Sequence, residues 1–116
     1  MKTFYGRKLG RPTGHRFAML RNMAASLLHH EKIETTRPKA REVARFTERL
    51  ITAAKAEGMN AQRKVARHLP KGPARSKLFE VLVPRYKARQ GGYTQFILKG
   101  QRFSDGAEMG ILKLTS

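Results

Sequence analysis

Two long stretches of this chain carry many positive charges and no acidic residue, and they set the strictest limit on how it can fold. No Asp or Glu occurs from Met1 to His30, and none occurs between Glu80 and Asp105. The whole chain of 116 residues has a formal net charge of +17. Like charges held this close repel one another and oppose a compact state unless a polyanion neutralises them. The charge therefore predicts a nucleic-acid partner, because each neutralised phosphate releases a condensed counterion.

The composition fits one small domain without covalent or metal crosslinks. An apolar content of 40% supports a modest core. The absence of cysteine excludes a disulfide framework and the usual Cys-containing zinc site, and it suits a reducing compartment. No apolar run approaches the roughly 20 residues that a membrane-spanning helix needs. We therefore expect no membrane contact, no cofactor and no small-molecule substrate.

The first residues form a basic arm. Residues 1–12 contain Gly6, Gly10 and Pro12, which break any amphipathic helix and argue against a transit peptide. The arm has few apolar anchors, so we expect it to become ordered only on a polyanion. We expect a single α+β RNA-binding domain over residues 13–116.

Apolar residues that recur every three or four positions predict four or so helices, because this spacing places them on one helix face. Capping residues, prolines and glycines set the expected boundaries. The first expected helix begins at Thr13 and breaks at His29-His30-Glu31, and the second runs from Thr36-Arg37 to Gly58. The third runs from Asn60 to Leu69. The fourth begins at Pro73 and is interrupted at Pro84, and the residues on its core side are Leu78, Phe79, Val81 and Leu82.

Three short β-prone segments complete the expected fold. One is a short strand near residues 31–36, and the other two are residues 94–99 and 109–114. The turn pair Asp105-Gly106 lies between the last two and predicts an antiparallel hairpin. This order predicts an α+β fold with the helices packed on one face of a small sheet.

No catalytic or metal centre is predicted. Adjacent side chains such as His29 and His30 diverge in either a helix or a strand, so they are poorly placed to share one metal. Gly91-Gly92 has no Lys-Ser or Lys-Thr after it and is not a phosphate-binding P-loop. We therefore expect no enzymatic activity.

The segment before the double glycine is the clearest candidate for nucleic-acid contact. Arg85, Lys87 and Arg89 have no compensating acid nearby in the sequence, which favours a phosphate-binding role. Tyr86 and Tyr93 allow two interpretations, stacking on an exposed base or burial in the core. The double glycine permits backbone angles that are closed to other residues, so Arg85, Arg89 and Tyr93 are expected to converge on one surface patch.

Ordered sequence blocks give the chain a family resemblance over essentially its whole length. They include Gly6-Arg7-Lys8-Leu9, Arg21-Asn22-Met23-Ala24, Pro38-Lys39-Ala40 and, as the most distinctive block, Gly91-Gly92-Tyr93-Thr94. In these blocks the chain resembles the bacterial-type ribosomal large-subunit protein seventeen family. Gln95 and Lys113 depart from that family's pattern, which has Arg and Glu at these places.

The resemblance implies a structural constituent of the large ribosomal subunit, located in the cytoplasm on the ribosome. It implies contacts with large-subunit ribosomal RNA and neighbouring ribosomal proteins, and a position near the nascent-chain exit. A nucleoid or other architectural nucleic-acid-binding protein is the alternative, although no helix-turn-helix pattern or dimer seam is evident. The candidate RNA-binding residues are Lys2, Arg7, Lys8, Arg11, His15, Arg16, Arg21, Lys39, Arg85, Lys87, Arg89, Tyr93, Lys99 and Arg102.

Overall fold

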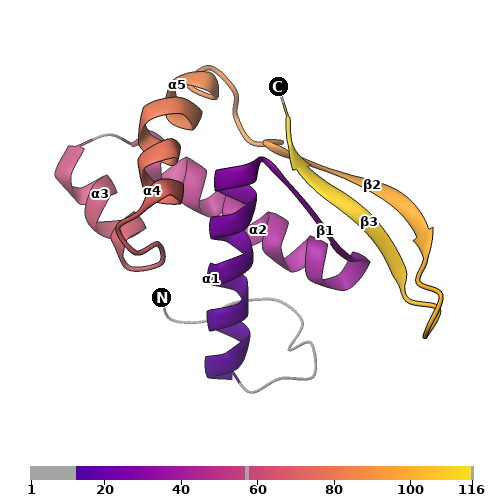
Figure 1. Ribbon diagram of the computed structural model, residues 1–116. Coiled ribbons are helices and arrows are strands. Elements are labelled where there is room, and N and C mark those ends of the chain that lie inside the picture. The colour runs from indigo at the N-terminus through magenta and orange to yellow at the C-terminus, as the bar shows by residue number, and fades with distance from the viewer. Residues whose placement is uncertain (1–12, 57, 116) are drawn as a thin grey trace.

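The computed structural model describes residues 13–56 and 58–115 and confirms the predicted α+β fold (Figure 1). The predicted basic arm, residues 1–12, lies outside the described residues. The helices are α1 (Thr13–His30), α2 (Arg37–Lys55), α3 (Gly58–Ala66), α4 (Pro73–Lys77) and α5 (Val83–Arg85), and the strands are β1 (Lys32–Thr36), β2 (Thr94–Gln101) and β3 (Glu108–Leu114).

The three strands form one antiparallel sheet in the order β1-β3-β2, so the last strand of the chain lies in the middle. The predicted hairpin is confirmed as β2 paired with β3. In one row across the sheet, Lys113 lies between Lys32 and Gln95, so the two departures from the family pattern face each other. Gly110 is required by packing, because a Cβ atom there would lie 2.2 Å from the ring of Phe96.

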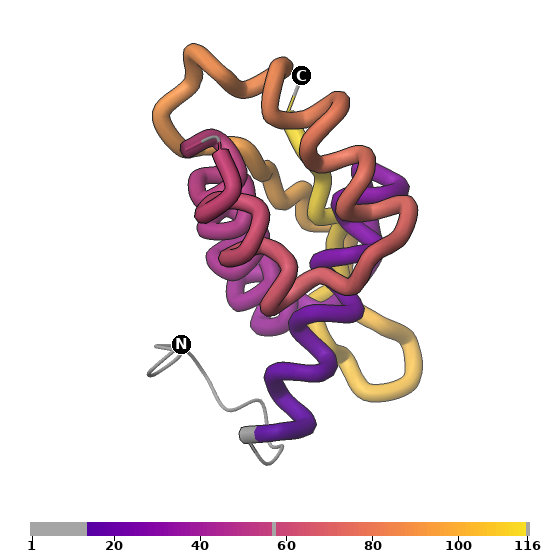
Figure 2. Tube along the Cα trace, turned by 90° about the vertical axis from the view of Figure 1, so that its left-hand side faces the viewer, coloured from indigo at the N-terminus to yellow at the C-terminus, as the bar shows by residue number. Residues whose placement is uncertain are grey.

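Helices α1 and α2 cover one face of the sheet and pack against each other, as Figure 1 shows. Figure 2 shows α3 lying beside α2 on the side away from the sheet. The predicted apolar faces of the first two helices are confirmed in their main residues, because these side chains are buried. They are Leu20, Ala24, Leu27 and Leu28 on α1, and Ala40, Val43, Leu50, Ile51 and Ala54 on α2.

The predicted boundary between the second and third helices is wrong. Helix α2 ends at Lys55, and the amide of Ala56 closes it by donating to the carbonyl of Ala53 at 3.3 Å. Gly58 has a φ of 86° and begins α3 rather than capping α2. Asn60 therefore lies inside α3 and does not cap it.

Pro84 does not end the fourth helical segment as predicted. Helix α4 continues through a π-helical turn (Leu78–Leu82) into α5, and the amide of Val83 donates to the carbonyl of Leu78, five residues earlier. Pro84 follows this turn in α5, and the widened backbone of the π-helical turn accommodates a residue that lacks an N–H. Leu78 and Leu82 are buried as expected, but Val81 is 43% exposed, so its assignment to the core is wrong.

The two tyrosines belong to the core, which decides between the alternatives left open by the sequence. Tyr86 and Tyr93 are buried, with ring centroids 5.1 Å apart. The hydroxyl of Tyr86 donates to the carbonyl of Thr115, and Lys55 Nζ donates to the hydroxyl of Tyr93 at 2.9 Å. Burial raises the pKa of Tyr93, but hydrogen bonds from Lys55 and Thr52 outweigh it and leave the pKa below its usual value. Neither ring is available to stack on a base.

Candidate nucleic-acid interface

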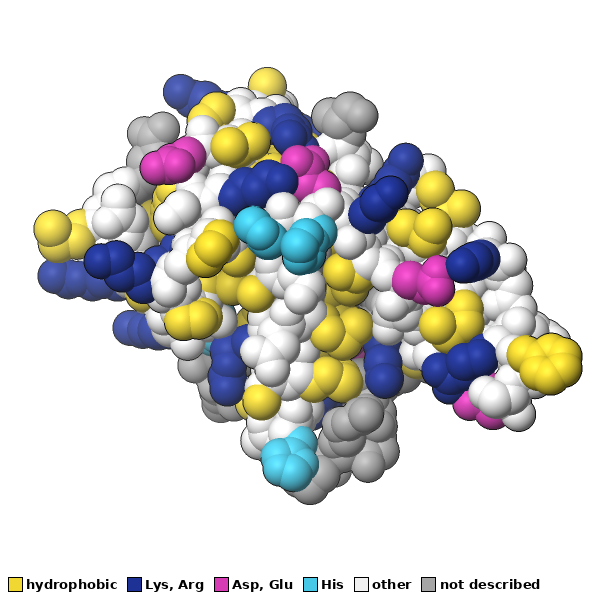
Figure 3. All heavy atoms as spheres, in the orientation of Figure 1, with side chains coloured by type: hydrophobic (Ala, Val, Ile, Leu, Met, Phe, Trp, Pro, Cys, Tyr) yellow, Lys and Arg dark blue, Asp and Glu magenta, His cyan; other side chains and the backbone are white. Residues whose placement is uncertain are grey.

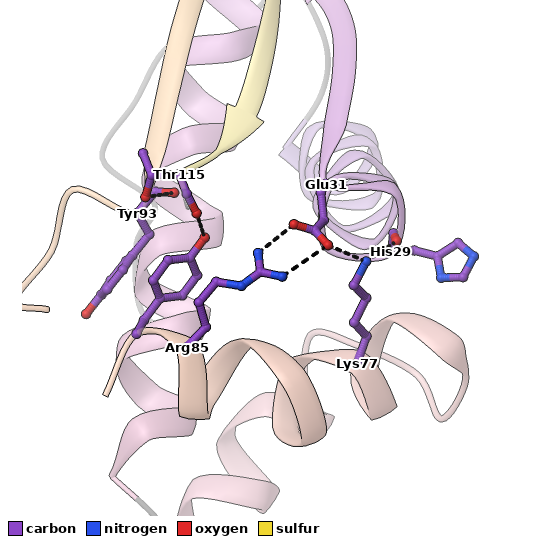
Figure 4. Close-up of polar contacts among 7 residues, drawn as sticks. His29, Glu31, Lys77, Arg85, Tyr93 and Thr115 are labelled. Carbon is purple, nitrogen blue, oxygen red and sulfur yellow. Dashed lines mark hydrogen bonds and ion pairs between the residues drawn. The ribbon is translucent and has the colours of Figure 1, made fainter. Parts of the chain in front are cut away.

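Glu31, at the end of α1, holds a cluster of three charges together (Figure 4). Its carboxylate accepts hydrogen bonds from Arg85 Nη1 at 2.5 Å and Arg85 Nη2 at 3.3 Å, and it pairs with Lys77 Nζ at 2.8 Å. Lys77 also donates to the carbonyl of His29 at 2.9 Å. The hydrogen bonds from Arg85, and then those from Lys77, lower the pKa of Glu31 to about 2.

The premise that the C-terminal basic residues lack compensating acids is therefore wrong for Arg85, Lys99 and Arg102. Arg85 pairs with Glu31, which lies 54 residues away in the sequence. Lys99 pairs with Glu34 at 2.7 Å, and Arg102 pairs with Asp105 at 2.5 Å. Folding brings Glu31 to Arg85 and Glu34 to Lys99 from distant parts of the sequence, whereas Asp105 follows Arg102 by three residues.

The double glycine adopts the predicted backbone but does not gather a basic patch. Gly91 and Gly92 have φ values of 84° and 67°, which favour glycine. Arg89 Nη1 donates to the carbonyl of Gly92 at 3.2 Å. Arg85 reaches toward Glu31 while Tyr93 points away from that cluster (Figure 4), so the expected convergence is wrong.

The other candidate residues are spread over several elements. His15 is exposed at the start of α1, and Arg21 is half-buried further along the same helix. Arg16 is buried, with its guanidinium carbon 5.2 Å from the centroid of the Phe17 ring. Lys39 is half-buried in the first turn of α2, and Lys87 is exposed after α5. Lys2, Arg7, Lys8 and Arg11 lie outside the described residues.

Helix α2 carries an arginine ridge that the sequence analysis missed. Arg37, Arg41, Arg45 and Arg49 are exposed and follow one another at intervals of four residues. Residues four apart lie on the same face of a helix, so these guanidinium groups form one row. The regular spacing is readable in the sequence, but it lies outside the two acid-free segments.

A groove between α2 and α3 extends this basic surface. Its volume is about 320 Å³. The rings of Phe46 and His68 pack edge to face beside it, with their centroids 5.5 Å apart. Burial lowers the pKa of His68, and the nearby charges of Arg21 and Arg67 lower it further. The residues that line the groove include no carboxylate; they are Phe46, Arg49, Leu50, Ala53, Lys64, Arg67 and His68.

A second basic hollow, of about 430 Å³, lies between α3 and α4. Arg63, Lys71 and Arg75 contribute its cations, and Met59 and Phe79 contribute apolar surface. Again no acidic residue is among those that line it. In Figure 3, Lys and Arg side chains gather at the left, over α3. We call the ridge and the two hollows together the cationic face.

The described part of the chain contains neither a group of metal-ligating side chains nor a membrane-spanning helix. Within residues 13–56 and 58–115, no cluster of three or more His, Cys, Asp or Glu residues could hold a metal ion. His29 and His30 are both exposed, with ring centroids 4.5 Å apart. None of the described helices is long and apolar enough to pass through a membrane.

The fold and the cationic face define the class as a small, strongly basic α+β protein with exposed rows of cations. The family model described as ribosomal protein L17 matches residues 19–115. Similar proteins include three called "Large ribosomal subunit protein bL17". The one from Endomicrobium trichonymphae is 45% identical and covers 100% of this chain and 99% of that protein. The one from Borrelia turicatae is 47% identical and covers 98% of this chain and 93% of that protein. The one from Trichlorobacter lovleyi is 46% identical and covers 94% of this chain and 88% of that protein.

This chain belongs to the ribosomal protein L17 family. The family consists of structural proteins of the large ribosomal subunit rather than of enzymes.

Proposed function

We propose that the chain binds large-subunit ribosomal RNA and acts in the subunit as an electrostatic clamp without enzymatic activity. The cationic face is the principal contact surface among the described residues. The observation that carries this proposal is that cations line both of its hollows and no carboxylate does. Such a surface attracts phosphates, because cations line its hollows and no carboxylate is among the lining residues.

The candidate residues predicted from the sequence differ in how available they are for contact with RNA. His15, Arg21, Lys39 and Lys87 are at least partly accessible and suit phosphate contacts. Arg85, Lys99 and Arg102 are engaged with acids, so they are weaker candidates for phosphate contact than the cations of the cationic face. The arm residues Lys2, Arg7, Lys8 and Arg11 remain proposed contacts.

The family resemblance supports the finer parts of the proposal. They are a location on the cytoplasmic ribosome near the nascent-chain exit and contacts with neighbouring ribosomal proteins. The alternative, a nucleoid or other architectural protein, shares the charge but not the family. Sedimentation separates the two, because a ribosomal constituent stays with large subunits through a high-salt wash and a nucleoid protein does not.

The test is a salt titration of binding to large-subunit RNA fragments. We expect log K to fall by about 0.7 to 0.9 per phosphate contact for each tenfold rise in salt concentration. Lys64→Ala combined with Arg67→Ala should therefore reduce this slope by between one and two.

A matched control removes charges elsewhere. Lys32→Ala combined with Lys113→Ala removes two cations from the sheet, outside the cationic face, and changes the net charge by the same amount; it should leave the slope unchanged. A wild-type slope near zero would exclude the electrostatic mechanism. An equal loss of slope in both variants would show that the contact is not concentrated on the cationic face.

A further inference from the structure

The end of the β2–β3 hairpin exposes apolar side chains to an unusual degree. Phe103, in the connection between the strands, is as exposed as in an extended chain, at 106%. Ile97 and Leu98 on β2 are 43% and 54% exposed. Figure 3 shows hydrophobic side chains along the hairpin, on the right of the view, as far as its tip. We call Ile97, Leu98 and Phe103 the hairpin patch. Ile97 and Leu98 are consecutive on β2 and therefore lie on opposite faces of the hairpin, while Phe103 lies at its end. Several large exposed apolar side chains on one projecting element indicate an interaction site.

The turn that carries Phe103 is ordered by its own hydrogen bonds. The amide of Arg102 donates to the carbonyl of Ala107 at 2.6 Å, and the amide of Gly106 donates to the carbonyl of Arg102 at 2.8 Å. The carboxylate of Asp105 accepts from Arg102 Nε at 2.9 Å and from the amide of Ala107 at 3.1 Å. A turn fixed in this way loses little conformational freedom when a partner covers it.

The charges around the hairpin patch cancel one another, unlike those of the rest of the molecule. Two ion pairs lie along the hairpin: Lys99 with Glu34, and Arg102 with Asp105. They match two cations with two acids in a chain whose net charge is +17. Glu108, at the start of β3, pairs with Arg37 at the edge of the cationic face. The hairpin end is therefore apolar and locally neutral, while the cationic face is basic.

We propose that the hairpin patch docks into an apolar hollow of a neighbouring ribosomal protein rather than onto ribosomal RNA. This rests on the proposed function, since it assigns the two kinds of partner in the subunit to different surfaces. Phosphates bind uncompensated cations, and here the cations are already paired. An aromatic side chain on an ordered turn, with exposed aliphatic side chains on the strand that leads to it, is instead the type of anchor that protein interfaces bury at their centre.

Photo-crosslinking inside assembled subunits tests the proposal directly. Phe103→p-benzoylphenylalanine is introduced into the full chain, salt-washed large subunits are irradiated, and the products are identified by mass spectrometry. We expect one ribosomal protein to be crosslinked, at apolar residues. Crosslinks to ribosomal RNA, or none, would overturn the proposal.

A second probe separates this proposal from the proposed function. Lys64→p-benzoylphenylalanine, on the cationic face, should crosslink to RNA. If it does not, the proposed function fails, whatever the probe at Phe103 reports.

A conventional variant gives an independent measurement. Phe103→Ser removes only exposed surface, so the free chain should keep its thermal midpoint and its salt slope on RNA, while its retention on salt-washed subunits falls several-fold. The control Val81→Ser, at an exposed apolar residue on the π-helical turn, should not change retention. Undiminished retention of Phe103→Ser, or a weaker affinity for free RNA, would contradict the proposal.

Discussion

Replacing Glu31 by Gln tests whether the charge cluster at the end of α1 stabilises the fold. The substitution keeps the size of the side chain and removes the negative charge that Arg85 and Lys77 share. Those two cations come from α4 and α5, so the cluster ties this helical segment to the junction of α1 and β1. We expect Glu31→Gln to weaken that connection and lower the free energy of unfolding.

The pKa of Glu31 sets an upper limit on the effect. A fall from 4.5 to about 2 corresponds to about 3.4 kcal/mol at 1.36 kcal/mol for each pKa unit. The side chain is 33% exposed, so water screens the pairs and reduces their contribution. We therefore expect a loss of about 1 to 2 kcal/mol at pH 7.

The pH dependence has a defined sign. Because folding lowers the pKa of Glu31, its contribution is fully present above the unfolded value of 4.5 and is lost as the pH falls toward about 2. Urea unfolding of the wild type and Glu31→Gln should show a full difference at pH 7 that shrinks between about pH 5 and pH 2.

Glu80→Gln, which neutralises an exposed acid on the π-helical turn, is the matched control and should stay close to the wild type at every pH. Equal stabilities of the wild type and Glu31→Gln at pH 7, or a difference that persists unchanged at pH 2, would refute the reasoning.

Three other substitutions test the sheet and the core by urea unfolding. Lys113→Glu replaces the repulsion between Lys113 and Lys32, which lie directly opposite each other, by an attraction. The variant should be more stable than the wild type by about 0.5 kcal/mol at low salt and by less at high salt. Equal stability of the two proteins at low salt would contradict this. Tyr86→Phe loses the hydrogen bond to the carbonyl of Thr115 and should lower the free energy of unfolding by about 1 kcal/mol. An unchanged free energy of unfolding would show that water, and not this carbonyl, satisfies the hydroxyl. Gly110→Ala introduces the clash with the aromatic ring on β2 described above and one of 2.5 Å with the backbone carbonyl oxygen of Ile97, and it should cost about 1 to 3 kcal/mol. A neutral result would mean that both the ring and the strand backbone can move aside.

Local sequence signals predicted the parts of the fold that local interactions determine. The apolar periods of α1 and α2 are long, and each begins beside a clear start signal, Thr13 or Pro38. The hairpin has two apolar runs joined by a turn pair. These features need no knowledge of the rest of the molecule.

The errors arose where distant residues decide the outcome. Nothing near Arg85 in the sequence reveals that Glu31 neutralises it, because the two meet only in the folded chain. Pro84 ordinarily ends a helix, but a widened turn with a buried Leu78 and Leu82 accommodates it. The groove beside α2 likewise depends on the packing of α3, which the sequence pattern did not specify.

The central place of β3 has a consequence for the order of folding. Strand β1 pairs with β3 and not with β2, so residues 32–36 have no strand partner until residues 109–113 have been synthesised. Helices α1 and α2 can form much earlier from contacts near in sequence, whereas the sheet depends on contacts of high sequence separation. We therefore expect β1 to remain an unpaired edge on the nascent chain while the helices that will cover it already exist. The slow step of folding is then the arrival of the hairpin, which closes the sheet and joins the two ends of the fold in a single event.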